Sequence, residues 1–159
     1  METFAFKPAD DPQSAPQPLI AISISFRGHS SVITALFDTG SDITHLSRDW
    51  TNYFNVDASL VPELPVGMLG DHEVSGALAF VNARLDGHDF TMPVLFHSDE
   101  TTNLFGRPGV MELYAVEIDC VASELRVEWK HAIETGADRM KHDLLAVEGN
   151  FLNGWDVDQ

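Results

Sequence analysis

The chain has 159 residues and a mass of 17.5 kDa, which is enough for one domain with its own core. Its 25 acidic and 9 basic residues give a formal net charge of −16 at pH 7, which argues against binding to nucleic-acid phosphates. No apolar run reaches the roughly 18 residues of a membrane span, and the amino terminus lacks signal-peptide order. The single cysteine, Cys120, excludes an internal disulfide and fits a reducing compartment. We therefore expect a cytoplasmic protein without membrane or nucleic-acid partners.

The first 18 residues are expected to form an extended leader, because four prolines and several polar residues disfavour helix and bury little apolar surface. Residues 19–26 then alternate apolar and small polar side chains with a period of two. Residues 31–37 are again apolar and β-branched, and residues 27–29 suit a turn. This pattern predicts a β-hairpin.

A short helix is expected after this hairpin. Ser47 can cap a helix beginning near Arg48. Trp50, Tyr53 and Phe54 would then fall on one face at helical spacing.

Strands are expected again between residues 60 and 96. Residues 74–85 and 89–96 fit two strands joined by Asp86-Gly87, a dipeptide suited to a tight hairpin turn. Ahead of them, glycines 67 and 70 flank an apolar pair, which suggests another hairpin tip.

The last part of the expected domain combines a helix and a hairpin. Pro108 is placed early in a short helix, and residues 115–119 and 124–129 fit two paired strands. Residues 130–159 are expected to be a polar, partly helical tail. The predicted organisation is a leader over 1–18, a domain over 19–129 and this tail, and the predicted fold class is all-β with one or two short helices.

Asp38-Thr39-Gly40 carries the main chemical signal. An acid directly after an apolar strand, followed by a hydroxyl residue and a glycine, is held at a turn where backbone amides can reach it. A three-residue match alone also fits an ordinary strand-ending turn, so the choice between a catalytic loop and such a turn depends on the residues around the motif.

With its surroundings, the motif resembles the opening hairpin and catalytic loop of the retropepsin-like, or retroviral-type, aspartic proteases. The resemblance continues in order along the chain. Gly67-Met68-Leu69-Gly70 is similar to the flap tip, and residues 103–107 are similar to the apolar-apolar-Gly-Arg element. It covers roughly residues 18–129 and implies a retropepsin-like half-barrel that forms a two-fold homodimer.

The resemblance also implies an aspartic endopeptidase without a cofactor, acting on a peptide or protein. In this chemistry two carboxylates about 3 Å apart share one proton, one as general base on water and one as proton donor to the carbonyl oxygen. The second carboxylate would be Asp38 of another copy, with the active site on the two-fold axis. By the resemblance, Thr39 would link the two loops, and Gly40 would let the backbone approach the substrate.

Further expectations concern the residues around this acid. Ser41, where retroviral members usually carry alanine, would donate a hydrogen bond to Asp38. Asp42 and Arg107 would form an ion pair, because a guanidinium fork suits a carboxylate. The expected substrate-binding residues lie on the loop, at the flap tip or before the Gly-Arg: Ser41, Asp42, Gly67, Met68, Leu69, Gly70 and Leu104. For Met68, Leu69 and Leu104, ordinary core packing is an equal alternative.

No metal site is expected. The seven histidines, among them His97, show no helical zinc spacing and are interpreted as scattered surface residues. Cys120 has no evident activating base. Two alternatives to a general endopeptidase stay open: a retropepsin-fold dimer that binds extended peptides with little catalysis, and a protease that mainly processes itself.

Overall fold

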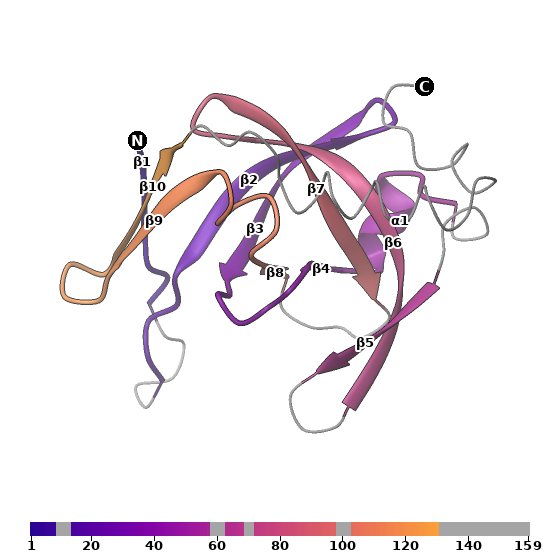
Figure 1. Ribbon diagram of the computed structural model, residues 1–159, viewed down its shortest axis with the longest axis horizontal. Coiled ribbons are helices and arrows are strands. Elements are labelled where there is room, and N and C mark those ends of the chain that lie inside the picture. Colours follow the sequence, from indigo (N-terminus) through magenta and orange to yellow (C-terminus); the bar gives the residue numbers. More distant parts are fainter. Residues whose placement is uncertain (9–13, 58–62, 69–71, 98–102, 131–159) are drawn as a thin grey trace.

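The computed structural model describes residues 1–8, 14–57, 63–68, 72–97 and 103–130, drawn in colour in Figure 1. A three-stranded sheet has the order β1 (Glu2–Ala5), β10 (Glu124–Trp129), β9 (Tyr114–Asp119). The larger sheet has the order β2 (Leu19–Phe26), β3 (His29–Phe37), β8 (Leu104–Phe105), β4 (Thr44–Ser47), β7 (His88–His97), β6 (His72–Leu85), β5 (Glu63–Met68). An additional β2–β6 pairing closes the larger sheet on itself.

The predicted hairpins are confirmed. In β2 buried residues alternate strictly with partly exposed ones, as the period of two predicts. Arg27 and Gly28 connect β2 to β3 with positive φ of 47° and 80°. Asp86 and Gly87 connect β6 to β7 with φ of 49° and 79°. Two successive positive φ values match the twist of paired strands, so both connections are tight two-residue turns.

One apolar cluster joins the two sheets. It combines inward side chains of the barrel strands with those of the small sheet, including Ile20, Ile22, Ile24, Ala77, Ala79, Val81, Val94, Phe96, Leu125 and Val127. The three isoleucines of β2 are fully buried, which accounts for the regular alternation of that strand. The small sheet is therefore part of the same core.

The leader contributes a strand that its composition did not predict. Glu2 lies opposite Val127, so β1 pairs antiparallel with β10, and Phe4 and Phe6 pack against the core. β10 consequently has a neighbouring strand along each edge. Of the predicted tail, only Lys130 lies within the described residues.

The helix after β4 is present as α1 (Asp49–Tyr53). The predicted Ser47 cap is wrong, because the N-cap residue is Arg48 and it makes no side-chain cap hydrogen bond. The Ser47 hydroxyl accepts the Asp49 N–H at 3.4 Å. Trp50, Tyr53 and Phe54 make mutual ring contacts with centroids 5.1 to 5.7 Å apart, as the helical spacing predicts. Among the described residues no helix is long and apolar enough to cross a membrane.

The helix predicted around Pro108 is wrong. Residues 107–113 form turns instead. The Met111 N–H donates to the Arg107 carbonyl at 2.9 Å, which closes a turn across Pro108, Gly109 and Val110. Gly109 has φ of 85°, in the left-handed region, so a right-handed helix cannot continue through it.

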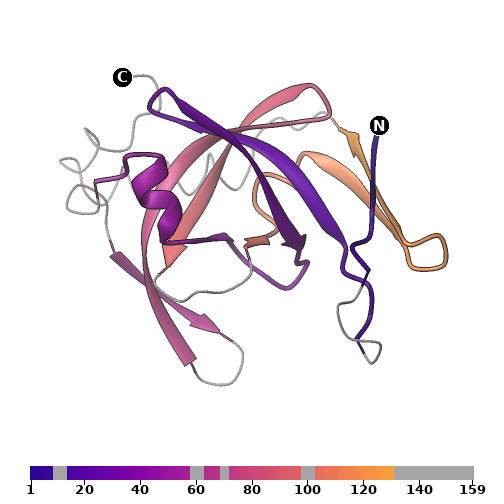
Figure 2. The same cartoon turned by 180° about the vertical axis from the view of Figure 1, so that it is seen from behind.

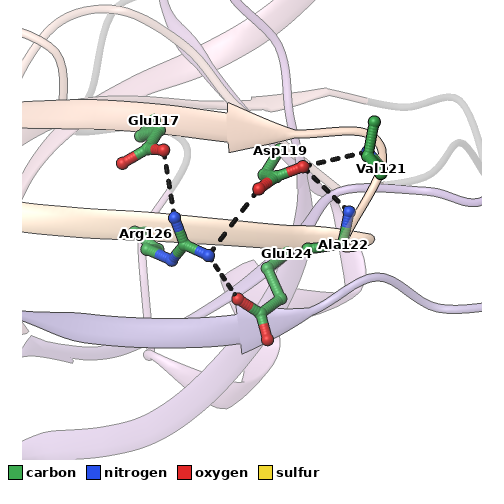
Figure 3. Close-up of polar contacts among 6 residues, drawn as sticks. All are labelled: Glu117, Asp119, Val121, Ala122, Glu124 and Arg126. Carbon is green, nitrogen blue, oxygen red and sulfur yellow. Dashed lines mark hydrogen bonds and ion pairs between the residues drawn. The ribbon is translucent and has the colours of Figure 1, made fainter.

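Arg126 organises charge on the predicted β9–β10 hairpin (Figure 3). Its guanidinium lies 3.0 Å from Glu117, 2.7 Å from Glu124 and 3.7 Å from Asp119. Asp119 also accepts the Ala122 N–H at 2.8 Å, and this hydrogen bond is the main reason that the pKa of Asp119 is lowered. Because these groups are close to solvent, they favour this turn geometry more than they stabilise the fold.

Tyr114 links the two sheets through a buried hydrogen bond. Its hydroxyl, on β9, donates to the Leu85 carbonyl at the end of β6 at 2.7 Å. Burial raises the pKa of Tyr114, with further contributions from nearby carboxylates. We expect Tyr114→Phe to lower the free energy of unfolding by about 1–2 kcal/mol, because a buried carbonyl loses its donor.

Tyr53→Phe is the matched control for this measurement. The Tyr53 hydroxyl also donates to a carbonyl at 2.7 Å, that of Ser30, but this bond is exposed and water can replace it. Urea unfolding of both variants should show a clear loss for Tyr114→Phe and less than about 0.5 kcal/mol for Tyr53→Phe. Equal losses would mean that the buried bond has no special role between the sheets.

Candidate active site

Asp38 lies directly after β3, on the turn that carries the predicted catalytic motif. Its backbone N–H donates to the Phe105 carbonyl at 2.9 Å. Its carboxylate Oδ1 accepts the Gly40 N–H at 2.8 Å. Asp38 is half-buried, whereas Thr39 and Gly40 are exposed. The backbone therefore holds the carboxylate in one orientation near the surface.

The two-residue strand β8 supports this turn from within the larger sheet, where it lies between β3 and β4. Phe105, which is fully buried, pairs with Phe37 in a parallel arrangement. On its other edge, β8 meets β4, where Leu104 lies opposite His45. β8 thus connects the strand before the Asp38 turn to the strand after it.

The Gly106-Arg107 segment adds two further contacts to the same turn. The Arg107 N–H donates to the Ser41 carbonyl at 3.0 Å, and the Gly106 N–H donates to the Thr44 hydroxyl at 3.3 Å. A Cβ on Gly106 would lie 2.4 Å from the Ile43 carbonyl oxygen. The close approach of the two segments therefore requires glycine at this position.

Asp42 and Arg107 form the predicted ion pair between the turn and the Gly-Arg segment. Their side chains are 83% and 50% exposed, so solvent screening limits the pair to at most about 1 kcal/mol. The pair orients the turn more than it stabilises the fold.

The predicted hydrogen bond from Ser41 to Asp38 is wrong. The Ser41 hydroxyl donates to the Ile43 carbonyl at 2.6 Å. The residue closes its own turn locally, as serine hydroxyls commonly do. Because the one proton of the Ser41 hydroxyl takes part in the hydrogen bond to Ile43, Ser41 stabilises the shape of the loop and does not donate to the Asp38 carboxylate.

The predicted flap corresponds to the β5–β6 hairpin. Gly67 and Met68 end β5, with Met68 opposite His72, whereas Leu69 and Gly70 lie outside the described residues. In both views, the turn that follows β3 lies between this hairpin and the three-stranded sheet (Figures 1 and 2).

Leu104, another predicted substrate-binding residue, is half-buried on β8. Its partners on the neighbouring strands are Leu36 on β3 and His45 on β4. It therefore lies beside the Asp38 turn, and its substrate-binding role stays a prediction.

Two histidines near the site were not identified from the sequence. His45 is 5% exposed and His97 is 2% exposed, which contradicts the interpretation of the histidines as surface residues. His97 ends the apolar strand β7, which was an available signal, whereas β4 (Thr-His-Leu-Ser) offers no such signal for His45. Among the described residues, no group of three or more histidine, cysteine or acidic side chains could hold a metal ion.

Of the comparisons with known proteins, only the one with solved structures found a similarity. No protein-family model matches the sequence, and no curated protein matches it. Among solved structures, the chain is similar to EIAV protease in complex with the inhibitor HBY-793. That similarity has a TM-score of 0.45 and 18% sequence identity, and covers 62% of this chain and 88% of that one.

The chain has a mainly β fold with one short helix, as predicted. The features that define it here are the β2–β3 hairpin ending in Asp-Thr-Gly, the β8 and β4 strands beside that motif, and the projecting β5–β6 hairpin.

Proposed function

We propose that the chain is an aspartic endopeptidase that acts as a homodimer, with one water activated between two Asp38 carboxylates. The observation that carries this proposal is the fixed position of Asp38. Its backbone N–H donates to the Phe105 carbonyl, and its carboxylate accepts the Gly40 N–H, on the turn that follows β3.

Amide hydrolysis needs a base that takes a proton from water and an acid that protonates the carbonyl oxygen. Two carboxylates brought together across a two-fold axis share one proton and supply both groups. Each chain has one Asp-Thr-Gly, so a single copy supplies half of this arrangement. The exposure of Thr39 and Gly40 supports a second copy covering this face.

Charge gives this association a pH dependence. A dimer doubles the formal charge of −16 carried by each chain at pH 7, and this self-repulsion weakens as carboxylates become protonated or salt is added. We expect the monomer fraction in sedimentation experiments to fall from pH 7 to pH 5 and from low to high salt. A monomer fraction that stays constant or rises would contradict this prediction.

The function itself is tested with a peptide library at pH 3 to 8, over a range of protein concentrations. A dimeric enzyme should show a specific activity that rises with chain concentration until association is complete. If peptides bind without being cleaved at any pH, the chain is a binding module and not an enzyme. Mass spectrometry of the purified chain detects cleavage confined to itself, which would favour the self-processing alternative.

A further inference from the structure

The β6–β7 hairpin is apolar on both of its faces. Residues 77–81 and 92–96 are continuous apolar runs, a pattern typical of strands that are buried from both sides. Alternate residues of these runs belong to the core cluster. The side chains between them point the other way and are not members of that cluster. We call this second set the outer face; it consists of Leu78, Phe80, Pro93 and Leu95, which pair across the two strands.

The outer face is as well shielded from water as the core. All four of its side chains are buried, and the two leucines and the phenylalanine have no exposed surface. Toward the turn of the hairpin the shielding ends. The next pair on this face, Asn82 and Thr91, is partly exposed, and the pair after it, Arg84 and Asp89, is exposed. A cover of limited extent therefore lies over the apolar pairs.

The described elements that pack against β7 do so on its other face. The ring of Phe54, which follows α1, lies 6.4 Å from that of Phe96. The ring of Tyr114, on the small sheet, lies 5.7 Å from that of Phe90. Phe90 and Phe96 both belong to the core cluster. The strands β2, β4 and β5 pair with the hairpin edge to edge, so they extend the sheet without covering it. Within the described ranges, these contacts leave the shielding of the outer face unexplained.

We propose that residues 131–159, the segment after β10, fold back over the hairpin and cover the outer face. The position where this segment starts supports the proposal. Trp129 stacks on His88, the first residue of β7, with ring centroids 4.5 Å apart. Pro93 lies roughly 17 Å further along the strand. Residues 131–159 exceed this distance even as a helix, which rises about 1.5 Å per residue. The inference goes beyond the proposed peptidase and holds whether or not peptides are cleaved.

The sequence of this segment supplies an apolar side. Ala137, Met140, Leu144 and Val147 recur at intervals of three and four residues, so a helix over 137–147 would carry them along one stripe. A helix that packs such a stripe on an apolar sheet face is the common layered arrangement of domains. Of the short ranges outside the described residues, only 58–62 offers more than one large apolar side chain, those of Leu60 and Val61. Two side chains are too few to shield the four residues of the outer face.

Thiol labelling of the full chain tests this cover. Pro93→Cys in a Cys120→Ser background places one thiol on the outer face, and the native chain, with its exposed Cys120, gives the rate of an unshielded thiol. The outer-face thiol should react at least about 100-fold more slowly than Cys120. Adding Leu144→Asp should speed its reaction at least about tenfold, because a charge cannot stay buried against an apolar face. His142→Asp, which places the same charge on the opposite side of the predicted helix, is the matched control and should change the rate less than about twofold.

Two results would overturn the proposal. A labelling rate that Leu144→Asp leaves unchanged would assign the cover to residues 58–62. Protection that increases with chain concentration would assign it to a second copy of the chain. If Pro93→Cys does not fold, binding of the dye anilinonaphthalene sulfonate, which reports exposed apolar surface, gives the same decision in chains that keep Pro93. Leu144→Asp should then bind more dye than the native chain and His142→Asp should not, whereas equal binding by the two variants would contradict the proposed cover.

Discussion

Replacement of Asp38 by asparagine is expected to lower peptide hydrolysis by at least about 10³-fold while the chain still folds and associates. The amide has nearly the same shape as the carboxylate, and its oxygen can still accept the Gly40 N–H. It cannot accept a proton from water, and in a symmetric dimer both copies lose this capacity. Hydrolysis should therefore be lost without a change in stability of more than about 1 kcal/mol.

Asp89→Asn is the matched control for hydrolysis. The side chain of Asp89 is 74% exposed near the start of β7. Among the described residues it forms an ion pair with Arg84, in which Oδ1 lies 3.7 Å from the Arg84 Nε. Mixing native chains with an excess of Asp38→Asn chains provides a sharper test, because mixed dimers contain one carboxylate. Activity should fall as the variant is added, and full activity in the mixture would contradict a shared active site.

Gly106→Ala is expected to lower the free energy of unfolding by about 3 kcal/mol or more. Its Cβ would lie 2.4 Å from the Ile43 carbonyl oxygen and 2.9 Å from the Ser41 carbonyl oxygen. These are backbone atoms, so no side-chain rotation can relieve the overlap. The turn that carries Asp38 to Ile43 has to move away from β8, and the hydrogen bond from the Arg107 N–H to the Ser41 carbonyl is strained or lost.

Gly40→Ala separates this structural effect from an effect on catalysis. Its Cβ would meet the Asp38 Oδ1 at 3.2 Å, a contact that a shift of a few tenths of an ångström relieves. Urea unfolding should give a small change for Gly40→Ala and a large one for Gly106→Ala. Gly40→Ala should nevertheless reduce hydrolysis, because the carboxylate is displaced. A Gly106→Ala variant as stable as the native chain would show that the two segments can separate freely.

Local patterns predicted the parts of the fold that local interactions determine. The β2–β3 and β6–β7 hairpins follow from alternating side chains and from turn residues that tolerate positive φ, all within short segments. The Asp-Thr-Gly turn and its ion pair with Arg107 were predicted from the order of motifs along the chain. The Ser41 hydroxyl was assigned to the wrong acceptor, because the choice between two nearby acceptors depends on the exact course of the loop.

Other features depend on residues distant in sequence or on a single backbone angle. His45 and His97 become neighbours only because β4 pairs with β7. The sequence of neither strand predicts this parallel pairing. The helix predicted at Pro108 failed because the next residue, Gly109, adopts a left-handed conformation. Residues 2–5 look like part of a proline-rich leader until their partner strand is known.

The pairing of β1 with β10 has a consequence for biosynthesis. Because Glu2 lies opposite Val127, the first strand emerges from the ribosome long before its partner has been made. The β9–β10 hairpin can form from local contacts, whereas β1 must wait until almost the whole described chain is available. Phe4 and Phe6 stay without their core contacts during that interval. The apolar side chains of this strand thus depend, during synthesis, on chaperones or on rapid completion of the chain for their protection from water.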